Sequence, residues 1–154
     1  MGLRCDDPFA SVAARVVSMR ADELLEHSDG VLNTREIERL HDMRVASRRL
    51  RAAMEVFEPC FPRKRFRAAL KEVKAVADAL GERRDRDVSI ATLVKFGEKL
   101  TAADRHGVLV IIDRLRDEQA LANDRLVPVI ERRRLARLRE RIRELAAAAE
   151  EKTA

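Results

Sequence analysis

Residues 40–57 read LHDMRVASRRLRAAMEVF, and this stretch decides the fold class. Its apolar residues recur at spacings of three and four, which is the period of an α-helix with one buried face. On a helical wheel they occupy an arc of roughly 100°. They are Met43, Ala46, Leu50, Ala53, Met54 and Phe57, with Leu40 just outside the arc. The stretch therefore predicts an amphipathic helix packed against a helical core.

The helical period continues on both sides of this stretch, and runs of β-branched residues are few. Helix-breaking and capping residues divide the chain into about five helical segments. The first predicted segment runs from Pro8 to about His27, and the second from an N-cap at Thr34 to the break at 59–62. The third runs from Arg63 to Leu80, where Gly81 stops it. The fourth runs from Asp85 to about Leu100, and the fifth begins at an N-cap at Thr101. Pro128 either kinks or splits the last segment. We expect one all-α domain over residues 1–150, an antiparallel bundle of about five helices.

The charge of the chain is unevenly distributed. The 154 residues include 46% hydrophobic ones, enough for a core, and carry a net charge of +5 with a pI near 9.7. Residues 44–74 hold ten basic and three acidic residues, a net charge of +7, so the remainder sums to −2. Such clustering is typical of a site that binds a polyanion.

The basic residues of this window form two stripes with the same spacing. His41, Arg44, Arg48 and Arg51 are related by i, i+3, i+7 and i+10, and the next helix repeats the pattern at Lys64, Arg67, Lys71 and Lys74. Like charges at these spacings repel each other by a few tenths of a kcal/mol per pair. A solvated surface whose long side chains cover apolar neighbours is the alternative interpretation. Two matched stripes on helices joined by a short link favour anion binding.

Three further residues have two interpretations each. His41 is either a core or capping histidine, or a phosphate contact whose proton a bound anion would stabilise. Asp85 and Asp87, in the run RRDRD at 83–87, either bind a cation or, as we favour, act structurally. In the structural interpretation Asp85 caps a helix and both acids orient neighbouring arginines.

Several classes of protein are not expected. The longest apolar run, 108–112, is too short to cross a bilayer, and no secretory signal is present. Cys5 and Cys60 form neither a disulfide framework nor a metal motif, which favours a cytoplasmic protein. The three histidines lack metal-ligand spacing, and no catalytic or cofactor motif is found, so we expect no enzyme, metal or cofactor. The chain has no Trp or Tyr and only five Phe, which disfavours a base-stacking module.

Two motifs resemble those of a known family. LHDMRVASRRLR at 40–51 resembles the signature helix of the CHAD family, the histidine-bearing α-helical domains, and LGERRDRDV at 80–88 is similar to its second motif, L-G-x-x-R-D-x-D-V. The resemblance covers residues 9–130 best. It implies an all-α bundle without catalytic activity that binds inorganic polyphosphate through a basic surface and associates with polyphosphate granules. The implied contacts are His41, Arg44, Arg48, Arg49 and Arg51, with Lys64, Arg67, Lys71, Lys74 and Arg84 as further candidates.

The chain departs from the family pattern in one respect. Such domains commonly contain two related helical halves, each with a basic signature helix. Here His106 is followed by Gly107, Val108 and Leu109 instead of arginines, so the chain resembles a single half. Either two copies pair as a homodimer and complete the basic channel, or one copy binds a shorter anion.

The leading hypothesis is therefore non-enzymatic binding of inorganic polyphosphate. The main alternative is a nucleic-acid-binding helical protein, although no helix-turn-helix with base-reading side chains stands out. An enzyme that acts on phosphorylated substrates is a third hypothesis.

Overall fold

The computed structural model describes residues 8–151, and this range consists of five α-helices without a strand. They are α1 (Phe9–Glu26), α2 (Ile37–Val56), α3 (Arg63–Gly97), α4 (Ala102–Leu126) and α5 (Arg132–Glu151), with one 3₁₀ turn, η1 (Glu58–Cys60). The predicted all-α class and the number of helices are confirmed. Cys5, and with it any pairing with Cys60, lies outside the described residues.

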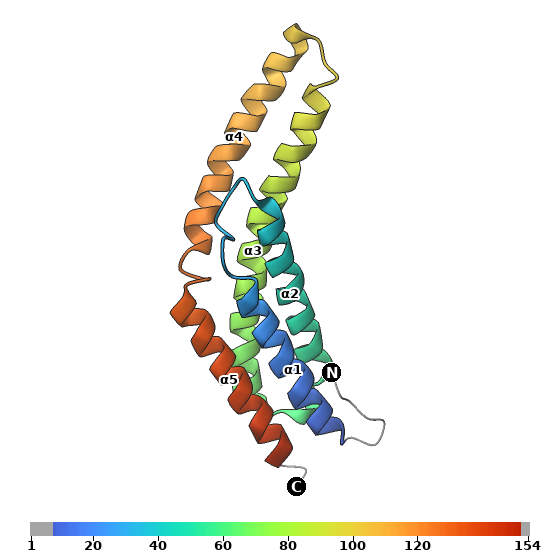
Figure 1. The fold of residues 1–154 in the computed structure, drawn as a ribbon, viewed down its shortest axis with the longest axis vertical. Helices are drawn as coiled ribbons and strands as arrows, with labels where there is room; N and C mark the ends of the chain where they lie inside the picture. Colours follow the sequence, from blue (N-terminus) through green and yellow to red (C-terminus); the bar gives the residue numbers. More distant parts are fainter. Residues whose placement is uncertain (1–7, 152–154) are drawn as a thin grey trace.

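Four helical segments form the bundle that contains the core. α1, α2, the first half of α3, and α5 pack around buried apolar side chains (Figure 1). α2 and α3 are antiparallel neighbours, as the short link between them predicts. The apolar arc predicted for α2 faces this core, where Met43, Leu50 and Met54 have no exposed surface. The opposite face of α2 is therefore left to solvent.

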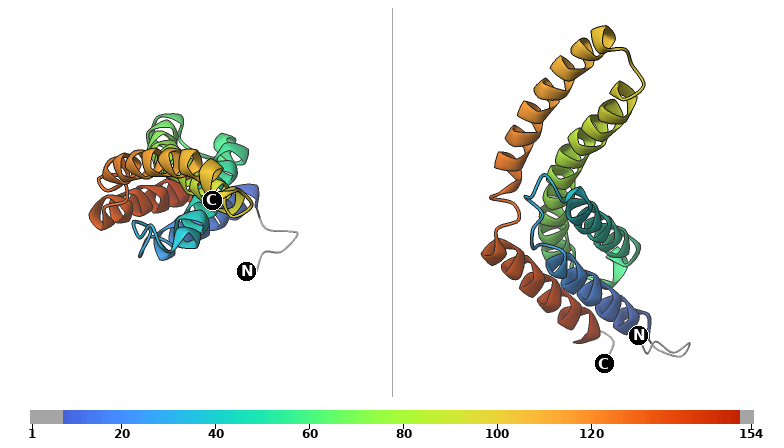
Figure 2. Two further views of the ribbon diagram at one scale, coloured as in Figure 1. Left: turned by 90° about the horizontal axis from the view of Figure 1, so that it is seen from above. Right: turned by 45° about the horizontal axis from the view of Figure 1, so that its top comes forward.

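The second half of α3 continues beyond the bundle and pairs with α4 alone. The two helices form a projecting hairpin, which we call the arm, residues 88–118 (Figures 1 and 2). α3 has 35 residues and is therefore about 50 Å long. Within the arm, Gly97 and Ile112 are the buried residues. The arm thus has very little core of its own.

The predicted break between the third and fourth segments is wrong. Gly81 lies inside α3, and Asp85 is an interior residue of that helix rather than its N-cap. One glycine costs a helix only about 1 kcal/mol relative to alanine, and the packing of α2 and α4 on either side of this point offsets that cost. The count of five helices survives because Pro128 splits the last predicted segment into α4 and α5. Thr101 caps α4 as expected, since its side chain accepts a hydrogen bond from the Asp104 backbone N–H.

The predicted N-cap at Thr34 is also wrong, because α2 begins at Ile37 with Glu36 before it. Asn33 organises the turn instead: its Oδ1 accepts from the Arg35 N–H at 3.0 Å, and its Nδ2 donates to Glu36 at 3.1 Å. Gly30 in the same loop has a φ of +74°, the left-handed region that favours glycine. The α1–α2 loop therefore depends on Gly30 and Asn33.

Candidate anion-binding surface

The antiparallel pairing of α2 and α3 brings basic residues of both helices together. Lys74 of α3 lies opposite Arg51 of α2, and both contact Glu55: Glu55 Oε1 is 3.0 Å from Arg51 Nε and 3.5 Å from Lys74 Nζ. Two helical turns before Arg51, Arg44 of α2 lies beside Gly81 of α3. We call this line of contact the α2–α3 seam, defined by Arg44, Arg51, Glu55, Lys74 and Gly81. The charge of the seam therefore comes from two helices.

Arg44 has an unusual environment for a guanidinium group. Its Nε is buried and has no hydrogen-bond partner among residues 8–151. A Cβ added at Gly81 would lie 3.8 Å from this nitrogen, an ordinary van der Waals contact, so Arg44 packs close to the backbone of α3 at this point. Buried donors are normally paired, because an unmade hydrogen bond costs about 1–3 kcal/mol. An anion bound at the seam would supply the missing acceptor.

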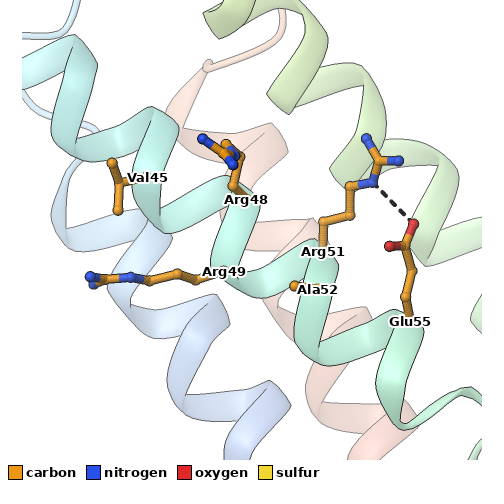
Figure 3. Close-up of a pocket in the computed structure, with 6 residues that line it drawn as sticks. All are labelled: Val45, Arg48, Arg49, Arg51, Ala52 and Glu55. Atoms are coloured by element: carbon orange, nitrogen blue, oxygen red, sulfur yellow. Dashed lines mark hydrogen bonds and ion pairs between the residues drawn. The ribbon is translucent and has the colours of Figure 1, made fainter.

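An open depression lies on the outer face of α2 (Figure 3). Its volume is about 490 Å³, and its lining comprises Val45, Arg48, Arg49, Arg51, Ala52 and Glu55. Arg48 is exposed and has no ion-pair partner in the described range. Arg49 points to the other side, where it donates to Glu23 of α1 at 3.0 Å. The structure thus brings Arg48 and Arg51 to one surface and separates Arg49 from the seam.

The stripe on α3 is basic only along its first three turns. Lys64, Arg67 and Lys71 are exposed and have no ion pair within the part of the chain that the structure describes. The same spacing continues at Asp78 and Asp85, so acidic residues end the basic surface. The sequence already places acids next to the basic stripes, because Asp78 follows Lys74 and Glu55 follows Arg51 by four residues, which is one helical turn.

His41 and Arg84 lie at the end of the seam where α2 begins. His41 is half-buried. The side chain of Arg84 is only 18% exposed, and its Nη1 donates to the Ile37 carbonyl at 3.3 Å and lies 3.9 Å from Glu38. Arg84 therefore ties α3 to the first turn of α2, and a contact with a bound anion remains a prediction for it.

Asp85 and Asp87 differ sharply in their surroundings. Asp87 is buried, accepts a hydrogen bond from Gln119 Nε2 at 2.6 Å and forms an ion pair with Arg83. Arg83 is fully buried, and this burial lowers the pKa of its guanidinium. The expectation that these acids orient arginines is confirmed for Asp87. Asp85 is exposed and has no ion pair within residues 8–151, so the same expectation fails for it.

Charge also shifts the ionisation of two carboxyl groups beside the basic residues. The hydrogen bond from Arg51 holds the pKa of Glu55 below its ordinary value, and Lys74 adds to the effect. The hydrogen bond from Arg20 lowers the pKa of Glu23 most, burial opposes it, and the hydrogen bond from Arg49 lowers the pKa further. Both carboxylates are thus negatively charged at neutral pH.

A second basic region lies on the opposite flank of α3, and the sequence analysis did not identify it. α5 carries a run of arginines, and Arg141 lines a depression of about 480 Å³ with Arg65, Ala68 and Glu144. Arg141 forms an ion pair with Glu72 of α3, and Arg143 and Arg139 pair with Asp22 of α1. These pairs partly neutralise Arg139, Arg141 and Arg143, unlike the exposed cations Arg48, Lys64 and Lys71 beside the seam, which are unpaired within residues 8–151.

In residues 8–151 no group of three or more His, Cys, Asp or Glu side chains could hold a metal ion. None of the helices in this range combines the length and the apolar character needed to cross a bilayer.

Comparison with known proteins identifies a family. The family model described as the CHAD domain matches residues 15–154, nearly the whole chain. No curated protein and no solved structure matches the chain significantly.

Proposed function

Because the chain belongs to the CHAD family, we propose that it binds inorganic polyphosphate at the α2–α3 seam and the exposed basic residues beside it. The CHAD domain is associated with polyphosphate binding and is generally a binding domain without catalytic activity. The observation that carries the proposal for this site is the set of cations without an acidic partner on two adjacent helices. In the described range this set includes Arg44, Arg48, Lys64, Arg67 and Lys71.

The chemistry of these groups suits a phosphate chain. Guanidinium groups donate two hydrogen bonds to one phosphate, while lysine ammonium groups act as point charges along the chain. Arg44 supplies the buried donor, and Arg48 and Lys71 supply exposed charge on either helix. His41, Arg49 and Arg84 extend the site at its edges in this proposal.

The test removes the charge of the site. The variant is Arg44→Gln/Arg48→Gln/Lys71→Gln/Lys74→Gln. At low salt we expect it to bind long-chain polyphosphate at least about tenfold more weakly than the wild type, because it forms fewer contacts with phosphate and its binding therefore releases fewer counterions. A matched control, Lys95→Gln/Arg132→Gln/Arg133→Gln/Arg137→Gln, removes four exposed cations elsewhere and should change affinity far less. Equal affinities of the two variants would refute the site assignment.

Nucleic acid is the competing ligand class. A phosphate backbone could also follow the exposed cations of α2 and α3, but the chain has few aromatic side chains for base stacking. Competition separates the two ligands: duplex DNA should fail to displace polyphosphate at equal phosphate concentration. Displacement would favour the nucleic-acid function.

The proposed role is binding without catalysis. If the protein instead hydrolysed phosphorylated substrates, phosphate release would depend on a residue such as His41. We expect no phosphate release from polyphosphate with the wild type or with His41→Ala. Release lost in the variant would establish an enzyme.

We further propose that two copies pair through their arms. The arm exposes large apolar side chains to solvent, since within it the two helices pack against each other: Val88 (47%), Val94 (43%), Phe96 (52%), Leu109 (48%), Val110 (57%) and Ile111 (51%). Two such hairpins would form a four-helix arrangement with a larger core. Light scattering should give a monomer without polyphosphate and a dimer with it, and Val110→Glu should stay a monomer in both. A monomer under both conditions would contradict the pairing.

Association with polyphosphate granules in the cytoplasm is part of the same proposal. A fluorescent fusion of the wild type should concentrate on granules, and the fusion of the four-charge variant should be diffuse. A variant that still concentrates there would show that another surface directs the association.

A further inference from the structure

One carboxylate lies among the cations of the α2–α3 seam. Oε1 of Glu55 is 3.0 Å from Arg51 Nε on the same helix and 3.5 Å from Lys74 Nζ on the neighbouring helix (Figure 3 shows the Arg51 pair). The same oxygen therefore accepts a hydrogen bond from α2 and forms an ion pair with α3. The nearby cations Arg48, Lys64, Arg67 and Lys71 have no such acid within residues 8–151.

The position of this oxygen is the one that a phosphate oxygen would take. A guanidinium group and an ammonium group from two helices converge on it, and both donate charge-assisted hydrogen bonds to oxyanions. A phosphate that entered the same position would meet the Glu55 carboxylate as a like charge. The carboxylate and the ligand thus exclude each other.

Displacement of Glu55 is energetically easy. The side chains of Glu55, Arg51 and Lys74 are 43%, 42% and 42% exposed, and exposed ion pairs contribute little to stability. A ligand that gains several contacts elsewhere on the surface can therefore move the carboxylate into solvent. A ligand with one phosphate forms contacts at this position only, so it has no other contacts to offset the loss of the Glu55 ion pairs.

We propose that Glu55 is an internal competitor for phosphate, which occupies the position between Arg51 and Lys74 and so restricts binding to anions of several phosphates. A single phosphate does not displace it, whereas a chain held at the same time by Arg44, Arg48 and Lys71 does. The inference rests on the proposed function, because the ligand and the surface are the same.

The test compares two neutral, isosteric substitutions. Glu55→Gln removes the competitor, and Glu72→Gln removes an equal charge from an ion pair with Arg141 on the other flank of α3. At low salt we expect Glu55→Gln to bind tripolyphosphate about fivefold more tightly than the wild type, and to bind orthophosphate measurably. Glu72→Gln should change either affinity by less than about twofold. Equal effects of the two substitutions would overturn the inference.

A double-mutant cycle assigns the effect to the seam. In an Arg51→Gln/Lys74→Gln background the carboxylate has no cations to occupy, so Glu55→Gln should no longer raise the affinity for tripolyphosphate. A gain that persists there would show that Glu55 acts through long-range charge alone, and would overturn the inference. If the wild type binds long-chain polyphosphate but Glu55→Gln behaves as Glu72→Gln, the competitor role fails and the proposed function stands. If neither the wild type nor Glu55→Gln binds any of these ligands, the proposed function fails as well.

Discussion

At the scale of single residues, position relative to the core decides what a charge does. Asp85 and Asp87 are separated by one residue on α3, yet Asp85 is exposed and Asp87 is 2% exposed. Asp87 offsets the charge of Arg83, whose Nε and Nη2 have no hydrogen-bond partner in the described part of the chain. The two carboxylates of one motif therefore have different roles, and Asp87 is structural.

Removal of Asp87 should destabilise the protein strongly. Asp87→Ala leaves the Arg83 guanidinium buried without a counter-charge, and breaking a buried pair in this way costs about 3–5 kcal/mol. The free energy of unfolding from urea titration measures the loss. Asp85→Ala is the matched control and should stay within about 0.5 kcal/mol of the wild type. A loss for Asp87→Ala as small as that of the control would contradict the structural role.

At the scale of elements, ion pairs tie neighbouring helices together around the core. Glu23 of α1 accepts from Arg20 of its own helix and from Arg49 of α2 at 3.0 Å. Since these contacts lower the pKa of Glu23 in the folded state, its contribution to stability is present above the unfolded value of 4.5 and is lost as the pH falls through the folded pKa.

Acid should therefore weaken the contact between α1 and α2. We expect the melting temperature of the wild type to fall as the pH drops below about 4.5, and Glu23→Gln to flatten that decline. Thermal unfolding followed by circular dichroism across this pH range measures both effects. Glu26→Gln, which changes an exposed glutamate one turn further along α1, should reproduce the wild-type profile. A Glu23→Gln profile identical to the wild type would refute the assignment.

The arm and the bundle are elements of unequal stability. Only Gly97 and Ile112 are buried in the arm, whereas α1 and α2 each bury several apolar side chains. Local opening is cheapest where few buried contacts are lost. Amides of the arm should therefore exchange with solvent at least about tenfold faster than those in the middle of α1 and α2, as measured by hydrogen exchange. Equal protection in the protein without polyphosphate would show that the arm is already covered.

At the scale of the whole molecule, the sequence predicts what depends on local period and misses what depends on contacts between helices. The buried face of α2, the link to α3 and the cap at Thr101 follow from spacing and from short-range chemistry. The continuity of α3 through Gly81 does not, because packing against α2 and α4 outweighs the propensity of one residue. The arm follows from that continuity and was missed for the same reason.

In the candidate site too, local spacing predicts some features, whereas others depend on contacts between helices. The two basic stripes are readable from their i, i+3, i+7 pattern, and the structure does place Arg51 and Lys74 opposite each other. The pairing of Glu55 with Lys74, and the turn of Arg49 toward Glu23, involve partners on other helices. No spacing within one helix encodes such pairs.

The unbroken α3 helix also has a mechanical consequence. Gly81, where Arg44 touches α3, is separated by sixteen residues from Gly97 at the end of the helix, a distance of about 24 Å along a stiff rod. A tilt of about 5° at the contact with α2 would displace the far end by about 2 Å. A rigid helix that pivoted at the seam would therefore move most at the far end of the arm.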